Sequence, residues 1–151
     1  RPDNPWTSLN PFKRVSQLAQ VKLLQQLIRS KKARTEHGQV VIEGDKIVQE
    51  LYESGDLSYL LTDDPSYKNL KDCHIVKPEV IEKISSVRSP QHFLGVAKLP
   101  KASSLKEMKW VLVLDKLQDP GNVGTLIRSA YALGWEGVFL IEPVCDLFND
   151  K

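Results

Sequence analysis

The first clear hydrophobic pattern in the chain begins at Ser16. Apolar residues then recur at steps of three and four positions, the period of one face of an α-helix; they are Leu18, Val21, Leu23, Leu24, Leu27 and Ile28. Basic side chains follow, where positive charge suits the negative end of a helix dipole. The pattern predicts one amphipathic helix that runs from Ser16 into this basic group and is separated from the next element by Gly38.

Short apolar runs alternate with helical patterns between residues 39 and 99. Two helices are predicted: one over Lys46–Ser54, capped by Asp45 and ended by Gly55, and one that opens at Pro78 and runs to about Ser85. The strands predicted around them are Gln39–Ile42, Leu57–Leu61, His74–Val76 and Phe93–Leu99. Strands that alternate with helices predict a small α/β sandwich.

A second unit is predicted after the polar stretch Pro100–Ser104. Trp110–Leu114 and Gly137–Ile141 are almost wholly apolar, as expected of strands that are buried on both faces. Asn122 is predicted to cap a helix that runs through Leu133 and stops at Gly134. The predicted segments are an arm or linker over 1–15, a domain over 16–100, a linker over 101–108 and the incomplete start of another domain over 109–151.

Composition narrows the class of protein only a little. Hydrophobic residues make up 41% and charged residues 26% of the chain, which is typical of a globular protein. The net charge of +2 provides no argument for nucleic-acid binding. The basic group is Arg29, Lys31, Lys32 and Arg34. It has two interpretations, a solvated helix end or a patch that contacts phosphates.

Cysteine and histidine spacing argues against a disulfide framework and against a metal site. Cys73 and Cys145 lie far apart without a C-x-x-C motif, and His37, His74 and His92 lack the spacing of metal ligands. We expect reduced thiols, an intracellular compartment and no bound metal. The sequence has neither the apolar run of about 20 residues that a membrane span needs nor a secretory signal at its start. Because it begins at Arg1, we expect a processed or excised chain.

The stretch that best fits a functional site is Leu114–Arg128. Polar and small residues gather there after a predicted strand, at the edge where open parallel sheets place their sites. Gly121 and Gly124 permit close approach of a ligand or backbone, and Arg128 shares a helix face with Gly124. A capped helix with a surface arginine is the alternative. Neither a G-x-G-x-x-G fingerprint nor a P-loop is present.

The spacing Asp-Pro-x-Asn-x-Gly-x-x-x-Arg, followed by Ala-x-x-x-Gly, resembles the first signature motif of SpoU methyltransferases. It is formed here by Asp119, Pro120, Asn122, Gly124 and Arg128, then Ala130 and Gly134. Val41–Gly44 and Ile84–Val96 resemble the substrate-binding domain of the same family. The resemblance implies an α/β protein. A small α/β/α sandwich similar to an RNA-binding ribosomal protein would be followed by a truncated β-α-β start of a knotted SPOUT methyltransferase domain.

The resemblance also implies an activity, the transfer of a methyl group from S-adenosylmethionine to a ribose 2′-hydroxyl of rRNA or tRNA. Arg128 is then the catalytic residue and Asn122 shapes the same pocket. A free arginine has a pKa of about 12 or higher. We therefore expect Arg128 to stabilise the developing 2′-oxyanion rather than to remove a proton.

The family adds two further motifs, which bind S-adenosylmethionine and form the dimer, beyond the region matched here. We therefore expect this chain to be inactive alone, to bind the cofactor poorly and to form the family's homodimer only as part of a longer protein. Expected compartments are a chloroplast, a mitochondrion or a bacterial cytoplasm. The predicted RNA-binding side chains are Arg29, Lys31, Lys32, Arg34 and Arg88.

Two other functions fit the sequence less well. One is a non-catalytic RNA-binding module over residues 16–99; the other is an unrelated doubly wound enzyme with a phosphate at the helix start near Asn122. Glu43 either matches a family position or, as a carboxylate before a helix, is a dipole partner or cap. His92 is expected to be a loop residue, and Trp110 and Trp135 are expected to be packing residues.

Overall fold

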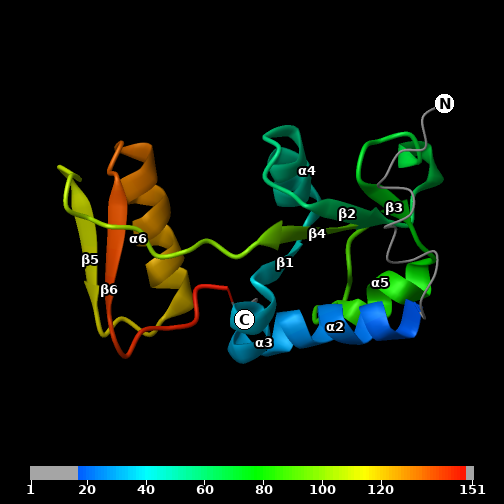
Figure 1. Ribbon diagram of the computed structural model, residues 1–151, viewed down its shortest axis with the longest axis horizontal. Coiled ribbons are helices and arrows are strands. Elements are labelled where there is room, and N and C mark those ends of the chain that lie inside the picture. Colours follow the sequence, from blue (N-terminus) through cyan, green and yellow to red (C-terminus); the bar gives the residue numbers. More distant parts are fainter. Residues whose placement is uncertain (1–16, 149–151) are drawn as a thin grey trace. The chain divides into compact units, whose positions relative to one another are not determined.

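The computed structural model describes residues 17–148, so the predicted arm over residues 1–15 lies outside the described residues. The chain divides after Pro100 into two compact units (Figure 1). Within the described range, no helix is long and apolar enough to cross a membrane.

Between residues 17 and 100, the first unit contains four α-helices, a short 3-10 helix and four strands. The helices are α2 (Gln17–Arg29), α3 (Lys31–His37), α4 (Asp45–Glu53), η1 (Pro65–Tyr67) and α5 (Pro78–Ile84). The strands are β1 (Gln39–Glu43), β2 (Tyr59–Thr62), β3 (Cys73–Ile75) and β4 (Phe93–Lys98). Every strand predicted in this region is confirmed to within two residues at each end.

The four strands form one mixed sheet in the order β1-β4-β2-β3. Strand β4 is antiparallel to β1 and to β2, with Val41 opposite Val96 and Leu61 opposite Leu94. The edge strand β3 is parallel to β2, with Leu61 opposite His74. The sequence places β4 last among the four, yet it lies in the middle of the sheet.

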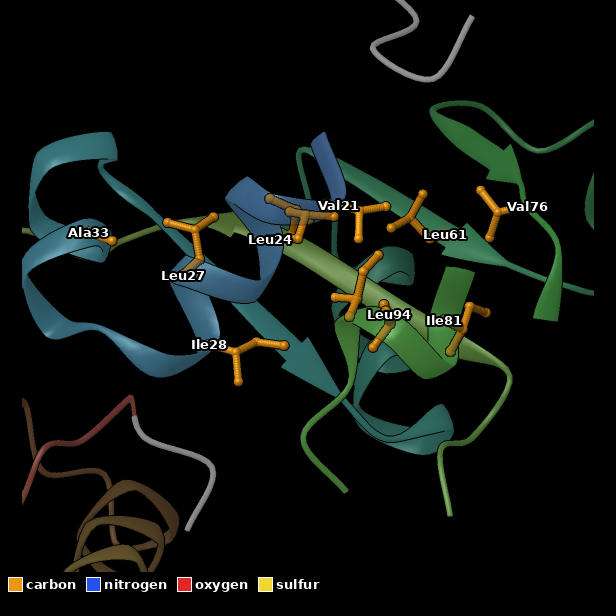
Figure 2. Packing of buried hydrophobic residues seen from close by; sticks show 11 residues of the cluster. Val21, Leu24, Leu27, Ile28, Ala33, Leu61, Val76, Ile81 and Leu94 are labelled. Carbon is orange, nitrogen blue, oxygen red and sulfur yellow. The ribbon is translucent and has the colours of Figure 1, made fainter. Parts of the chain in front are cut away.

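Helices cover both faces of this sheet. The larger core holds Leu24 and Leu27 of α2, Ile81 of α5, and Leu61 and Leu94 of the sheet (Figure 2). On the opposite face a smaller core holds Val48 of α4, Leu60 and Phe93. Neighbouring residues such as Leu60 and Leu61 enter different cores because successive strand side chains point to opposite faces. The predicted α/β/α sandwich is confirmed.

The predicted continuous first helix is instead two helices. Helix α2 ends at Arg29, and the side chain of Ser30 caps α3 by accepting a hydrogen bond from the Ala33 amide at 3.2 Å. Arg34 therefore turns inward and is only 2% exposed. Its guanidinium donates to the carbonyls of Leu27 and Ile28 at 2.7 and 3.0 Å, which satisfies acceptors at the end of α2 that lack a helical partner.

The predicted cap of the next helix is also corrected. Asp45 is the first residue of α4, and Gly44 occupies the cap position with φ +112°, a backbone conformation that favours glycine. The Asp45 carboxylate instead accepts a hydrogen bond from the Phe93 amide at 3.0 Å. Asp45 thus joins the start of α4 to the start of β4. Gly55 follows the end of α4, as predicted, and adopts φ +81°, a left-handed conformation that favours glycine.

The second unit contains β5 (Val111–Asp115), α6 (Pro120–Ala132) and β6 (Gly137–Ile141). The strands are parallel, with Val111 opposite Gly137 and Asp115 opposite Ile141. The predicted β-α-β unit is confirmed. The prediction that both strands are buried on both faces is wrong for this chain, because Val113 is 55% and Phe139 49% exposed. Helix α6 buries Leu114, Val123 and Ala130 on one side only.

Candidate functional site

The candidate site of the second unit lies where β5 ends and α6 begins. Asp119 caps the helix, because its carboxylate accepts a hydrogen bond from the Asn122 amide at 2.7 Å. Pro120 occupies the first helical position, which needs no amide hydrogen. The prediction that Asn122 is the cap is therefore wrong: Asn122 is already inside the first turn of the helix, and its side chain is exposed.

Two backbone hydrogen bonds hold the loops at the carboxyl ends of the two strands together. The Lys116 amide donates to the Ile141 carbonyl at 3.1 Å, and the Cys145 amide donates to the Leu117 carbonyl at 3.3 Å. Lys116 adopts φ +53°, which turns the chain sharply after β5. The loop before α6 is thus anchored at the edge where parallel α/β sheets place their ligands.

Arg128 is exposed and lies over Gly124. A β-carbon built on Gly124 would lie 3.4 Å from Arg128 Nη1, so the predicted shared face is confirmed and a larger residue at 124 would crowd the guanidinium. Arg128 Nη2 donates to Thr125 Oγ1 at 3.4 Å, longer than the usual range and therefore weak. The guanidinium is held against the helix but remains open to solvent.

Thr125 is a site residue that the sequence analysis missed. It lies three positions from both Asn122 and Arg128, so the three residues follow one another along an exposed side of the helix. Its hydroxyl contacts the arginine directly. The signal available in the sequence was the i, i+3 spacing between a hydroxyl residue and the motif arginine.

The predicted RNA-binding side chains separate into two groups. Arg29, Lys31, Lys32 and Arg88 are exposed, and Lys32 forms an ion pair with Glu36 at 3.7 Å on α3. Arg34 is buried and hydrogen-bonded to backbone carbonyls, so it cannot reach a phosphate. The basic group therefore offers three surface cations.

The remaining candidate side chains have local structural partners. His92 lies in an exposed loop, as predicted, with Nδ1 2.9 Å from Asp63 Oδ1, and the hydrogen bond to Asp63 raises the pKa of His92. Burial raises the pKa of the Cys73 thiol to about 11, which makes it a poor nucleophile. No group of three or more metal-ligating side chains occurs between residues 17 and 148.

Trp110 and Trp135 stack on each other, with ring centroids 6.4 Å apart and planes inclined by 29°. Both were expected to be packing residues of buried strands; they contact each other, yet Trp110 is 64% and Trp135 36% exposed.

Known families match both units. Residues 19–95 match the MRM3-like substrate binding domain, and residues 109–151 match the SpoU rRNA Methylase family. The chain therefore belongs to the family of the MRM3-like substrate binding domain, and its second unit is similar to the SpoU rRNA Methylase family. This result confirms the family predicted from the Asp119–Arg128 motif.

Individual relatives of the chain are also named as RNA methyltransferases. The chain is 32% identical over 130 residues to 23S rRNA (guanosine(2553)-2'-O)-methyltransferase RlmP of Bacillus subtilis, covering 82% of this chain and 52% of RlmP. It is similar to the structure of a putative RNA methyltransferase of the TrmH family from Porphyromonas gingivalis, with a TM-score of 0.72, 30% identity, and coverage of 87% and 54% of the two chains.

An AdoMet-bound rRNA methyltransferase from Sinorhizobium meliloti is also similar, with a TM-score of 0.67 and 28% identity over 86% of this chain and 54% of that one. The chain thus spans about half the length of these relatives.

Proposed function

We propose that this chain supplies the RNA-binding domain and the first part of the catalytic domain of an RNA ribose 2′-O-methyltransferase that acts on rRNA or tRNA. The observation that carries the proposal is the placement of Arg128, which lies over Gly124 and beside Thr125 on the exposed side of α6. RlmP, whose name specifies 2′-O-methylation of 23S rRNA, matches across both units.

Arg128 acts by electrostatic stabilisation. A ribose hydroxyl is a weak nucleophile, and negative charge develops on its oxygen as it attacks a methyl group. The exposed guanidinium offers several donors at once to the 2′-oxygen and a neighbouring phosphate. Thr125 positions the guanidinium, while Asn122, one turn earlier, offers an amide to the same RNA segment.

The cofactor of the whole enzyme is S-adenosylmethionine, which supplies an electrophilic methyl group when bound. The second unit alone fits this cofactor poorly, because large apolar side chains of its sheet, including Val113 and Phe139, remain exposed and so do not enclose a ligand. We propose that further protein surface must cover this sheet before the cofactor is held. The AdoMet-bound relative is about twice as long as the matched region.

Arg29, Lys31, Lys32 and Arg88 form the proposed phosphate contacts of the first unit. A homodimer of the longer protein and an intracellular location, in a bacterial cytoplasm or an organelle, belong to the same proposal. An RNA-binding module remains a second candidate for this chain by itself, because the first unit has both faces of its sheet covered and the second does not.

Methyl transfer tests the proposal. The chain is joined to the part of RlmP that follows the matched region, and transfer from labelled S-adenosylmethionine to bulk rRNA and tRNA is measured with mapping of the 2′-O product. Arg128→Ala should reduce transfer by about 100-fold or more, whereas Lys106→Ala, an exposed cation before β5, should not. Donor binding without transfer to any RNA would contradict the catalytic role and favour the RNA-binding module.

A further inference from the structure

A pocket of about 270 Å³ lies in the first unit, and none of its lining residues belongs to the SpoU motif. It lies among the end of β1, the start of β4 and the loop between α5 and β4; its lining residues are Glu43, Gly44, Val87, Ser89, Gln91, Phe93 and Leu94. The side chains of Phe93 and Leu94 are buried and those of Val87, Ser89 and Gln91 are exposed, so the pocket has an apolar base and a polar rim.

Hydrogen bonds build the walls of this pocket. The Ser86 hydroxyl donates to Glu43 Oε2 at 3.2 Å, and the Asp45 amide donates to Gln91 Oε1 at 2.6 Å. The Phe93 amide donates to the Asp45 carboxylate at 3.0 Å. These hydrogen bonds attach the loop over residues 85–92 to the junction of β1 and α4. The walls of the pocket are therefore fixed by specific contacts.

Glu43 is the pocket residue whose carboxylate is only partly hydrogen-bonded. Its second carboxylate oxygen, Oε1, is buried and has no hydrogen-bond partner within residues 17–148. The interpretation of Glu43 as a helix cap fails, because Gly44 caps α4 without a side-chain bond. An unpaired buried acceptor is costly, so the residue calls for a donor from outside the fold.

The size and chemistry of the pocket narrow the choice of donor. Its volume lies below the range of about 300–1,000 Å³ typical of drug-sized ligands, so it suits a single planar group. Single-stranded RNA presents such groups as unstacked bases that proteins read on their Watson–Crick edges. Guanine alone offers two adjacent N–H donors there, which match the two oxygens of a carboxylate.

We propose that this pocket receives one unpaired guanine of the RNA substrate, with the Glu43 carboxylate accepting hydrogen bonds from guanine N1–H and N2–H. Binding then requires a change of side-chain rotamer that uncovers the buried Oε1. The inference rests on the proposed RNA-binding function and adds a base specificity to it. Arg88 is exposed between the lining residues Val87 and Ser89, where its charge suits the phosphate of the same nucleotide. Uracil and adenine would each place an acceptor against the carboxylate.

The test measures binding of the 151-residue chain to fluorescent oligouridylates that carry one central guanosine, inosine, adenosine or uridine. Guanosine should bind at least about fivefold tighter than adenosine or uridine. Inosine, which lacks the N2 amino group, should fall between them. Glu43→Gln should abolish this order while leaving the salt dependence of binding to oligouridylate unchanged.

Glu50→Gln is the matched control, because Glu50 is an exposed carboxylate on α4 outside the pocket and its loss changes the charge equally. Ser89→Trp obstructs the exposed rim without touching the core, and should abolish the preference even where Glu43→Gln unfolds the domain. Binding without a guanosine preference would overturn the pocket and leave RNA binding intact. Absence of binding to every oligonucleotide would overturn both proposals.

Discussion

The two units of this chain differ in how completely their sheets are covered. In the first, helices on both faces bury residues such as Leu24, Leu61 and Val48 completely (Figures 1 and 2). In the second, one helix covers one face of two parallel strands, and Val113 and Phe139 remain half exposed. The RNA recognition that we propose for the first unit thus resides in a self-contained domain, whereas Arg128, the proposed catalytic residue, lies on an element whose sheet needs further covering surface.

The largest expected difference between the units concerns S-adenosylmethionine. We expect the 151-residue chain to show no stoichiometric binding of the cofactor by isothermal titration calorimetry, because the open sheet does not enclose a ligand. The same chain should bind RNA through its first unit. Tight cofactor binding by the chain alone would contradict this division of roles.

Truncation of an apolar side chain should lower the free energy of unfolding more in the first unit than in the second. Leu24→Ala removes a fully buried side chain from the larger core, and should lower the free energy of unfolding by about 2–5 kcal/mol. Phe139→Ala truncates a larger side chain of the second unit that is half exposed, and should cost less. Urea denaturation followed by circular dichroism measures both, and equal losses would show that the exposure difference has no energetic consequence.

The next largest expected effect is the loss of stability when Arg34, the buried arginine of the first unit, is replaced. Arg34→Ala leaves the carbonyls of Leu27 and Ile28 without their donor, which should cost about 2–3 kcal/mol. Arg29→Ala, an exposed arginine nearby in the sequence, is the control for stability. RNA binding should depend more on Arg29 than on Arg34. Arg29→Ala should therefore reduce the dependence of RNA affinity on salt concentration. If the Arg34→Ala protein were stable but bound RNA more weakly, Arg34 would be a phosphate contact and not a structural residue.

Asp119, the cap of α6 in the second unit, should contribute less to the free energy of unfolding than Arg34 does. Asp119→Ala removes the acceptor of the Asn122 amide, and should destabilise this unit by about 1 kcal/mol. Asp119→Asn should retain most of that stability, since asparagine caps helices nearly as well. Hydrogen exchange of the α6 amides measures the change. A greater loss in Asn122→Ala would mean that Asn122, and not Asp119, is the cap.

The smallest effect is a pH dependence in the first unit. The hydrogen bond to Asp63 raises the pKa of His92. The stabilisation is therefore fully present below the unfolded pKa of about 6.5 and is lost as pH rises through the higher folded value. An NMR titration should show the His92 pKa falling towards about 6.5 in Asp63→Asn. An unchanged pKa would exclude Asp63 as the cause.

Local patterns allowed most elements to be predicted. The period of Val21, Leu24 and Ile28 predicted α2, and the mostly apolar run Phe93–Leu99 predicted β4. The errors arose where two residues could serve the same local purpose. Asp119 and Asn122 are both good caps, and Ser30 followed a helical pattern without an obvious break. Only the backbone geometry distinguished them, because cap preferences differ by a few tenths of a kcal/mol.

The sequence by itself determined the α/β class, the two-part organisation and the motif from Asp119 to Arg128, because periodicity and spacing are local properties of the chain. Tertiary structure alone decided that Arg34 is buried, that β4 lies at the centre of the sheet and that Glu43 shares a pocket with Gln91. The position of β4 and the pocket of Glu43 and Gln91 depend on pairing between residues 31 to 59 positions apart, whereas Arg34 is buried against carbonyls only six and seven positions away. Long-range pairing follows from the burial of complementary surfaces, which no local pattern records.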